Sequence, residues 1–186
     1  MSENRMLKAA LAYAERGWCP VPLHTPHGTA CSCGHPNCGT SAGKHPRIIG
    51  WEQKASTDPV QIQAWWSKWP KANIGIACGP SGLVSVDVDI KDGIDGRETW
   101  RDLQQEHAFT DDGALVNLTG SGGQQLIFSS NGRALGNTAR KLGPGIDTRG
   151  SGGLFVAPPS LHYSGRLYTW DVAAHPLDHA AAPIPE

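Results

Sequence analysis

Apolar and polar positions alternate most clearly over residues 83–90, Leu-Val-Ser-Val-Asp-Val-Asp-Ile, which predicts a β-strand. The Gly-Pro-Ser-Gly run at 79–82 predicts a turn before it. Alternate side chains of a strand share a face, so we expect Asp87 and Asp89 together and Val88 on the opposite face. Carboxylates about 7 Å apart on one face repel each other unless a cation lies between them. The pattern predicts either a pair that binds Mg²⁺ or Mn²⁺ or a solvated pair on an exposed strand.

Helical spacing of apolar residues predicts helices over residues 4–16, 56–68 and 96–107. Gly17 supplies a stop for the first helix, and Pro59 lies in the first turn of the second. The second helix carries Trp65 and Trp66, with Trp69 close behind. Such a group is typical either of core packing, which the helical spacing favours, or of a platform on which nucleic-acid bases stack.

Short apolar runs bounded by Gly and Pro predict further strands, over residues 18–23, 73–78, 114–119, 124–128 and 154–157. Two prolines place the first of these at a sheet edge or a strand end. The Gly-Ser-Gly-Gly run at 120–123 predicts a hairpin between two of the strands, and residues 162–170 predict a last hairpin. The Ala-, Pro- and His-rich segment 173–186 is typical of a linker.

Composition changes this picture in one respect, which is the kind of partner to expect. The chain has 186 residues, a formal net charge of −1, and no apolar run long enough to span a membrane. Nucleic acid would therefore be bound through a local groove and metal ions, because bulk positive charge is missing. We expect one domain over residues 1–172, and the N-terminus does not resemble a signal peptide.

Three of the five cysteines crowd into the segment Cys31-Ser-Cys33-Gly-His35-Pro-Asn-Cys38. Without a secretory signal, such crowding favours metal binding in a reducing compartment over a disulfide framework. Thiolate and imidazole are the ligands that tetrahedral Zn²⁺ prefers. We predict a structural zinc site of Cys31, Cys33, Cys38 and His45 in a loop over about residues 27–47, with His35 as the alternative fourth ligand.

A glycine-rich run over residues 141–153 joins acidic and basic residues to an apolar strand. Closely spaced glycines let a backbone approach a ligand and turn its N–H groups toward phosphate. Arg149 adds a guanidinium that can bind phosphate through two hydrogen bonds. Lys141 and Arg149 are candidates for binding a triphosphate, and Ser121 and Ser151 for hydroxyl contacts.

Taken in order, the motifs are Cys-x-Cys-x₄-Cys with Gly-Lys-His-Pro, Asn-Ile-Gly-Ile-Ala, Val-Asp-Val-Asp, Ser-Gly-Gly, Gly-Ile-Asp-Thr-Arg-Gly-x-Gly-Gly and Pro-Pro-Ser. This order resembles the bifunctional primase–polymerase (prim-pol) N-terminal domain of the archaeo-eukaryotic primase superfamily, found in phage and plasmid replication proteins. The resemblance covers residues 11–170. It implies an α+β fold whose RRM-like mixed or antiparallel catalytic sheet is flanked by helices.

The resemblance also implies a metal-binding acid triad, to which Asp87 and Asp89 correspond in the first motif and Asp147 in the third. The family's second motif reads Ser-Gly-Gly-x-His, whereas here Ser121, Gly122 and Gly123 are followed by Gln124 and Gln125. Glutamine can donate an amide N–H to phosphate but carries no charge. We expect Ser121 to Gly123, Gln125, Lys141, Arg149 and Ser151 to contact nucleotide. His162 is either a further contact or an edge-strand histidine.

The expected function is template-dependent DNA priming and polymerisation, in which Mg²⁺ or Mn²⁺ assists nucleotidyl transfer from an NTP or dNTP to a 3′ hydroxyl. Single-stranded template and primer are the expected partners. The resemblance further implies a C-terminal helical primase segment, often a helicase, and a cytoplasmic location in a bacterial or archaeal cell. The missing histidine leaves open a catalytically weakened nucleic-acid-binding module in replication initiation. A metal-dependent phosphodiesterase would use the same acids.

Overall fold

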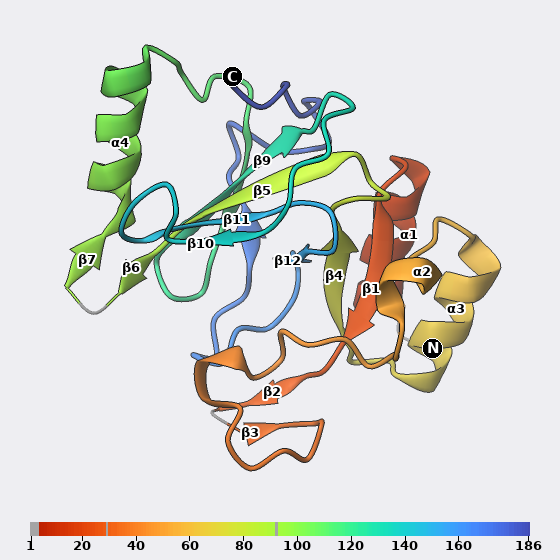
Figure 1. Ribbon diagram of the computed structural model, residues 1–186. Coiled ribbons are helices and arrows are strands. Elements are labelled where there is room, and N and C mark those ends of the chain that lie inside the picture. Colours follow the sequence, from red (N-terminus) through yellow and green to blue (C-terminus); the bar gives the residue numbers. More distant parts are fainter. Residues whose placement is uncertain (1–3, 29, 92) are drawn as a thin grey trace.

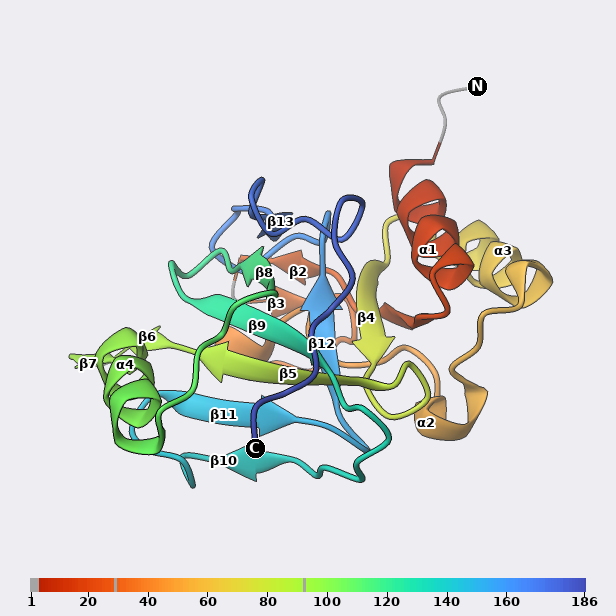
Figure 2. The same ribbon diagram turned by 90° about the horizontal axis from the view of Figure 1, so that it is seen from above.

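Two antiparallel sheets set side by side form the frame of the computed structural model, which describes residues 4–28, 30–91 and 93–186 (Figures 1 and 2). The smaller sheet has the order β1-β4-β12 and the larger one the order β10-β11-β5-β9-β8-β13. The strands of the smaller sheet are β1 (Cys19–Leu23), β4 (Asn73–Ala77) and β12 (Leu154–Ala157). Those of the larger sheet are β5 (Leu83–Val88), β8 (Leu115–Leu118), β9 (Gln124–Ser129), β10 (Thr138–Ala139), β11 (Ile146–Arg149) and β13 (Thr169–Trp170). The expected mixed α+β class is confirmed, and β1 lies at a sheet edge as its prolines predict.

Two short ribbons project from this frame. The first pairs β2 (Pro26–His27) with β3 (Ala30–Cys31) and carries the cysteine-rich loop. The second pairs β6 (Ile90–Lys91) with β7 (Ile94–Asp95) directly after the aspartate-bearing strand. In Figure 1 the β6–β7 ribbon continues from the end of β5, whereas the β2–β3 ribbon lies at the bottom of the view, beyond the end of β1.

The expected helices are present, and side-chain caps fix where they begin. They are α1 (Arg5–Glu15), α3 (Pro59–Lys68) and α4 (Gly96–His107). The short helix α2 (Trp51–Lys54) and a 3₁₀ turn at Gly39–Ser41 are additional. Asn4 accepts hydrogen bonds from backbone N–H groups of α1, while Asp58 and Asp95 do the same for α3 and α4. Such caps satisfy N–H groups that have no partner within the helix.

Helices α1 and α3 pack together on the smaller sheet and bury its apolar face. Trp66 is fully buried and Trp65 almost so, in one cluster with Ile74 and Ile76 of β4. The packing role predicted for these two tryptophans is therefore confirmed. Trp69 is partly buried, and the Arg47 guanidinium and the Lys68 ammonium lie over its ring.

Strand β5 separates two environments in the larger sheet. Val86 and Val88 point toward α4, where they pack with Trp100. On the opposite face, Leu83 joins the core shared with the smaller sheet. Asp87 lies on this second face because side chains alternate along a strand. The seam between the two sheets is thus apolar near the start of β5 and polar near its end.

The C-terminal part of the chain departs from the sequence predictions in one element. The hairpin predicted over residues 162–170 is wrong in its pairing, because it is reduced to a single bridge between Leu161 and Leu167, and β13 pairs with β8 instead. Within the predicted linker, Ala182 and Ile184 exchange backbone hydrogen bonds with Gly113 and Ser129. A domain limit at residue 172 stays a prediction. No helix in the described part of the chain is long and apolar enough to cross a membrane.

Candidate active site and metal centre

The paired strands β5 and β11 bring two of the predicted acids together. Asp87 of β5 is directly opposite Asp147 of β11 in the strand register, and Asp89 follows the end of β5. Asp87 and Asp89 line a cavity of about 290 Å³ at the seam between the sheets. Asp89 also lines a second hollow, which contains Asp147. The structure therefore gathers all three predicted acids around one end of the β5–β11 pair.

Asp87 is the most buried of these acids, with 15 % of its side chain exposed. Ser85 Oγ donates a hydrogen bond to Asp87 Oδ1 at 2.9 Å. Burial raises the pKa of Asp87 to about 6, although the nearby Arg149 guanidinium and the Ser85 hydrogen bond oppose that rise. A carboxylate held in this way gains from any cation that enters the cavity.

Arg149 lies between the two facing acids. Its Nε is 3.6 Å from Asp87 Oδ2, and its Nη2 is 3.0 Å from Asp147 Oδ2. Asp147 Oδ1 accepts a hydrogen bond from the backbone N–H of Arg140 at 3.1 Å. The oxygen-only donor set suits Mg²⁺ or Mn²⁺. Asp87 and Asp147 would hold such a cation, whose charge would then neutralise them as Arg149 does now.

Gln125 of β9 faces Asp87 from the other neighbouring strand and lines the same cavity. Its Oε1 accepts a hydrogen bond from Asn117 Nδ2 at 2.7 Å. Asn117 Nδ2 donates a second hydrogen bond, at 2.8 Å, to the backbone oxygen of Val156 in the smaller sheet. The oxygen of the glutamine amide is therefore committed to Asn117.

The glycine-rich loop between β8 and β9 reaches the same cavity. Ser121 lines it, and its hydroxyl is 2.9 Å from that of Thr119. A Cβ atom on Gly123 would lie 2.7 Å from the backbone oxygen of Val88, at the end of β5. Only glycine permits this approach, so the Ser-Gly-Gly motif is explained by its contact with the aspartate-bearing strand.

Among the predicted nucleotide contacts, Lys141, Ser151 and His162 line neither hollow, and neither do Gly122 and Gly123. Lys141 and Ser151 are exposed, and Ser151 packs beside Gly79, at the far end of β5 from Asp87. His162 is 2 % exposed, and its ring lies 4.2 Å from that of Tyr163 and 5.6 Å from that of Tyr168. The nucleotide-binding roles of these residues stay predictions.

Of the cavity-lining residues that were not predicted, two carry ionisable side chains, Lys44 and Tyr168. Lys44 lies in the Gly-Lys-His-Pro motif, but the neighbouring zinc ligand His45 gives that motif a sufficient explanation by itself. Burial lowers the pKa of Lys44, while the charges of Asp89 and Asp87 act in the opposite direction. The sequence signal that could have identified Lys44 was its position next to a predicted metal ligand. Nothing in the sequence indicates that it lies near the acids.

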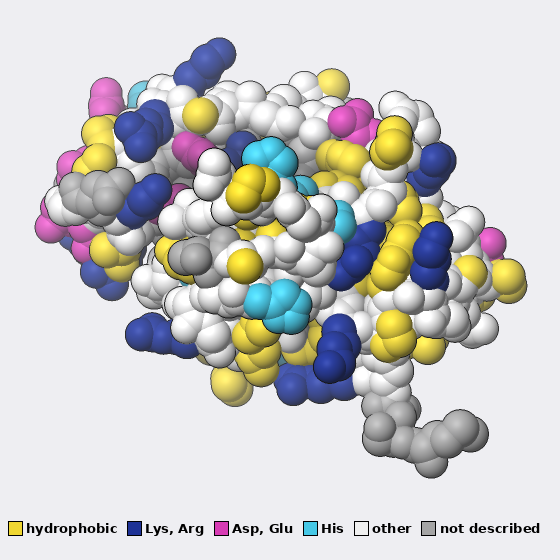
Figure 3. Space-filling view, turned by 90° about the horizontal axis from the view of Figure 1, so that it is seen from below, with side chains coloured by type: hydrophobic (Ala, Val, Ile, Leu, Met, Phe, Trp, Pro, Cys, Tyr) yellow, Lys and Arg dark blue, Asp and Glu magenta, His cyan; other side chains and the backbone are white. Residues whose placement is uncertain are grey.

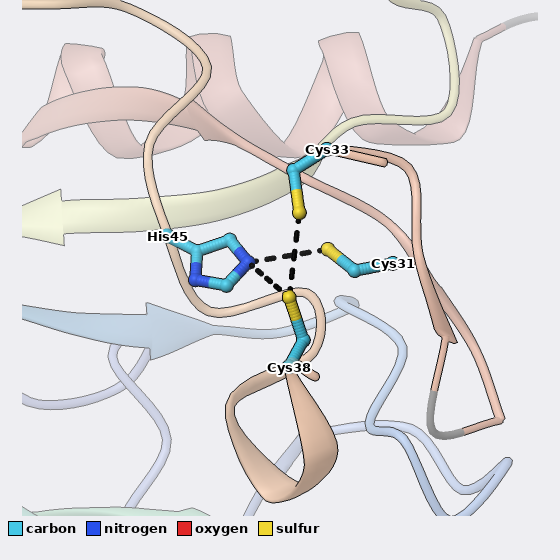
Figure 4. A group of neighbouring side chains, drawn as sticks. All are labelled: Cys31, Cys33, Cys38 and His45. Carbon is cyan, nitrogen blue, oxygen red and sulfur yellow. Dashed lines mark hydrogen bonds between the residues drawn. The ribbon is translucent and has the colours of Figure 1, made fainter. Parts of the chain in front are cut away.

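The predicted zinc ligands converge in the structure (Figure 4). One ligand atom from each of Cys31, Cys33, Cys38 and His45 lies within 4.8 Å of all the others. Three thiols and one imidazole this close fit a tetrahedral Zn²⁺ with Zn–S distances of about 2.3 Å. Among the described residues this is the one group of three or more potential ligands drawn together so tightly. His35 is outside it.

The chemistry of this cluster also favours a cation. Hydrogen bonding with Cys33, together with the neighbouring thiols, raises the pKa of Cys38 to about 11. A bound Zn²⁺ would remove that penalty, because it binds the deprotonated thiolate. The cluster sits near the surface, since Cys33 is exposed. Figure 3 looks onto this face, where histidine and apolar side chains gather over the β2–β3 region and Lys and Arg surround them.

Half-buried acids at a strand pair, lysine and arginine side chains beside them and a separate cluster of cysteines and histidine suit a metal-dependent phosphoryl-transfer protein. A family model for the N-terminal region of bifunctional DNA primase/polymerases (Prim-Pol) matches residues 10–186, and the chain belongs to this family. No curated protein matches the chain. Membership implies an enzyme of the nucleotidyltransferase type that acts in DNA replication on DNA and nucleotides.

Proposed function

We propose that this chain is a template-dependent DNA primase–polymerase domain that transfers a nucleotidyl group from an NTP or dNTP to a 3′ hydroxyl. The observation that carries the proposal is the facing pair of Asp87 and Asp147, with Asp89 lining both the cavity that contains Asp87 and the hollow that contains Asp147. Three carboxylates at one end of adjacent strands suit the binding of a metal-bound triphosphate.

In this reaction the primer 3′ oxygen attacks the α-phosphorus, a new P–O bond forms, and the bond to pyrophosphate breaks. Mg²⁺ or Mn²⁺ held by Asp87, Asp89 and Asp147 would stabilise the charge on the attacking and leaving oxygens, in the two-metal arrangement. Arg149 can exchange its carboxylate partners for phosphate oxygens once the acids bind cations. Ser121 is placed to contact the nucleotide at the cavity wall.

We also propose that the larger sheet is an RRM-like core. Its central strands have the spatial order β11-β5-β9-β8. Along the chain, α4 lies between β5 and β8. This order supports the proposal because it is that of a β-α-β-β-α-β unit. An irregular segment that contains β10 replaces the second helix. The Zn²⁺ site is assigned a structural role, since all four ligand positions come from the protein.

A second candidate function is a nucleic-acid-binding module of phage or plasmid replication initiation with weakened catalysis. It is favoured by Gln125, which stands where a histidine is expected and is already hydrogen-bonded to Asn117. Such a protein would bind primer–template without extending it.

Primer extension separates these functions. We expect the wild-type chain, given a labelled primer–template, dNTPs and Mg²⁺ or Mn²⁺, to lengthen the primer, and the Asp87→Asn variant to fail. Binding of primer–template without extension would favour the initiation module. Release of nucleotides from the primer without dNTPs would instead indicate a phosphodiesterase.

A further inference from the structure

Lys44 brings positive charge into the acidic cavity from the cysteine-rich loop. It lines the cavity together with Asp87 and Asp89. No ion pair or hydrogen bond joins its ammonium to another side chain in the described part of the chain, and the ring of Tyr163 lies 5.8 Å away. Asp87 and Asp89 share the cavity with this ammonium but make no ion pair with it, so a phosphate group that enters the cavity can contact it directly.

The backbone on the N-terminal side of Lys44 is fixed by β4. The carbonyl oxygen of Gly43 accepts a hydrogen bond from Asn73 Nδ2 at 3.1 Å. Gly43 has a positive φ of 78°, and a Cβ atom there would lie 2.5 Å from Pro26 Cδ. Glycine is therefore required for the turn that delivers Lys44.

The backbone on the C-terminal side is fixed by the thiolate cluster. His45, the next residue, places Nε2 at 3.2 Å from Cys31 Sγ and 3.5 Å from Cys38 Sγ. Its carbonyl oxygen accepts a hydrogen bond from the backbone N–H of His24 at 2.9 Å. Lys44 thus lies between two fixed residues. Gly43 is held by Asn73 of β4, and His45 would be held by Zn²⁺.

We propose that Lys44 binds the phosphates of the incoming nucleoside triphosphate, and that zinc binding next to it sets its position, so that zinc occupancy controls nucleotide affinity. The inference rests on the proposed function, because it takes the cavity to be the nucleotide site. It gives the zinc loop a part in substrate binding beyond holding its own fold. A purely structural loop would leave nucleotide affinity unchanged on zinc loss.

The test measures equilibrium binding of a fluorescent dNTP with excess Mg²⁺ and without primer or template, so that no turnover occurs. We expect Lys44→Met to raise the Kd about tenfold or more, since a charge-assisted phosphate contact is lost. Lys44→Arg should keep most of the affinity. Lys71→Met, at an exposed position outside the cavity, is the matched control. Zinc content, measured on each variant, should be unchanged.

Coupling to zinc is tested on the same assay. Cys33→Ser, or a zinc-selective chelator applied to the wild type, should raise the Kd by a factor similar to that of Lys44→Met. Added zinc should restore the chelated protein. Combining Cys33→Ser with Lys44→Met should weaken binding little beyond either change alone, because both act through one contact.

Several results would overturn the inference. An unchanged Kd for Lys44→Met, or equal affinity with and without zinc, excludes it. If Lys44→Met itself loses zinc, the charge role is decided by Lys44→Gln and Lys44→Arg, of which only the former should weaken binding. Nucleotide binding without primer extension would refute the polymerase function while leaving the Lys44 contact intact. Primer extension by the wild type, with an unchanged nucleotide Kd for Lys44→Met, would support the polymerase function and refute the Lys44 contact.

Discussion

Asp87 and Asp147 face each other across the antiparallel pair β5–β11, and one guanidinium, that of Arg149, contacts both carboxylates. The strand register therefore places the first and third acidic motifs side by side although 60 residues separate them in the chain. Strands, rather than loops, fix the backbone positions of both acids. Arg149 also supplies the charge that keeps the carboxylates compatible before a metal binds.

Neutralising an acid should abolish activity without harming the fold. Asp87→Asn, Asp89→Asn and Asp147→Asn should each lower the rate of primer extension about 100-fold or more, since each removes a group that would hold catalytic metal. Losses below tenfold in all of them would contradict the triad.

The stability of metal-free Asp87→Asn should equal or exceed that of the wild type above pH 6. Burial raises the pKa of Asp87 from 3.8 to about 6, so the folded protein binds more protons than the unfolded chain between these values. Stability therefore falls as pH rises through this window, and asparagine avoids the loss. Thermal unfolding in chelator across pH 4 to 8 measures the difference. A variant less stable than wild type at pH 8 would show that the carboxylate is stabilising.

Gln125→His should restore charge at the second motif. If position 125 contacts the triphosphate, an imidazolium binds it more strongly than a neutral amide does. We expect a lower KM for dNTP, most clearly below pH ~7 where the imidazole is more protonated. Single-nucleotide incorporation across pH, with Gln125→Ala as the comparison, tests this. Equal KM values for all three proteins would place position 125 outside the nucleotide contacts.

The cysteine cluster should bind about one zinc per chain. Cys33→Ser and Cys38→Ser should reduce the zinc content found by elemental analysis, whereas His35→Ala should not, because His35 lies outside the cluster. Cys19→Ser is the matched control, since Cys19 lies in β1, outside the cluster. Zinc loss in His35→Ala, with zinc retained in His45→Ala, would show that His35 and not His45 is the fourth ligand.

His162 should make folding sensitive to mild acid. Burial, with the charges of Lys44 and Arg166, lowers the pKa of His162 from 6.5 to about 4. The unfolded chain then binds more protons between these values, so stability is full above pH 6.5 and falls as pH drops toward 4. His162→Gln should flatten this part of the stability curve relative to wild type, as measured by urea unfolding at several pH values. Parallel curves for the two proteins would indicate that His162 titrates normally when folded.

Local patterns were sufficient to predict the strand that leads through Asp87 to Asp89 and the loop that carries the zinc ligands. Alternation over residues 83–90 predicted β5, and the crowding of Cys31, Cys33 and Cys38 predicted the metal cluster. In both cases the chemistry depends on residues close together in sequence. The placement of Asp147 came from family resemblance, because no local pattern reveals which strands pair.

Residues positioned by packing between the sheets could not be predicted. Asn117 donates a hydrogen bond to Val156 across the seam. Lys44 enters the cavity from the cysteine-rich loop, whose sequence was fully explained by metal binding. Proximity in sequence was misleading in the glycine-rich run. The turn after β11 carries Ser151 away from the acids, whereas Arg149, two residues earlier, reaches them.

The hydrogen bonds on either side of the facing Asp87 and Gln125 also bear on how this sequence can change: Ser85 donates to Asp87, and Asn117 donates to Gln125 and to Val156. Because Asn117 donates to position 125 directly, a substitution at one of these two positions alters what is tolerable at the other. Acquiring histidine at position 125 would leave Asn117 short of an acceptor unless that residue changed too. The two positions are thus expected to evolve as a pair, and a double-mutant cycle on Asn117 and Gln125 should give markedly non-additive free energies of unfolding.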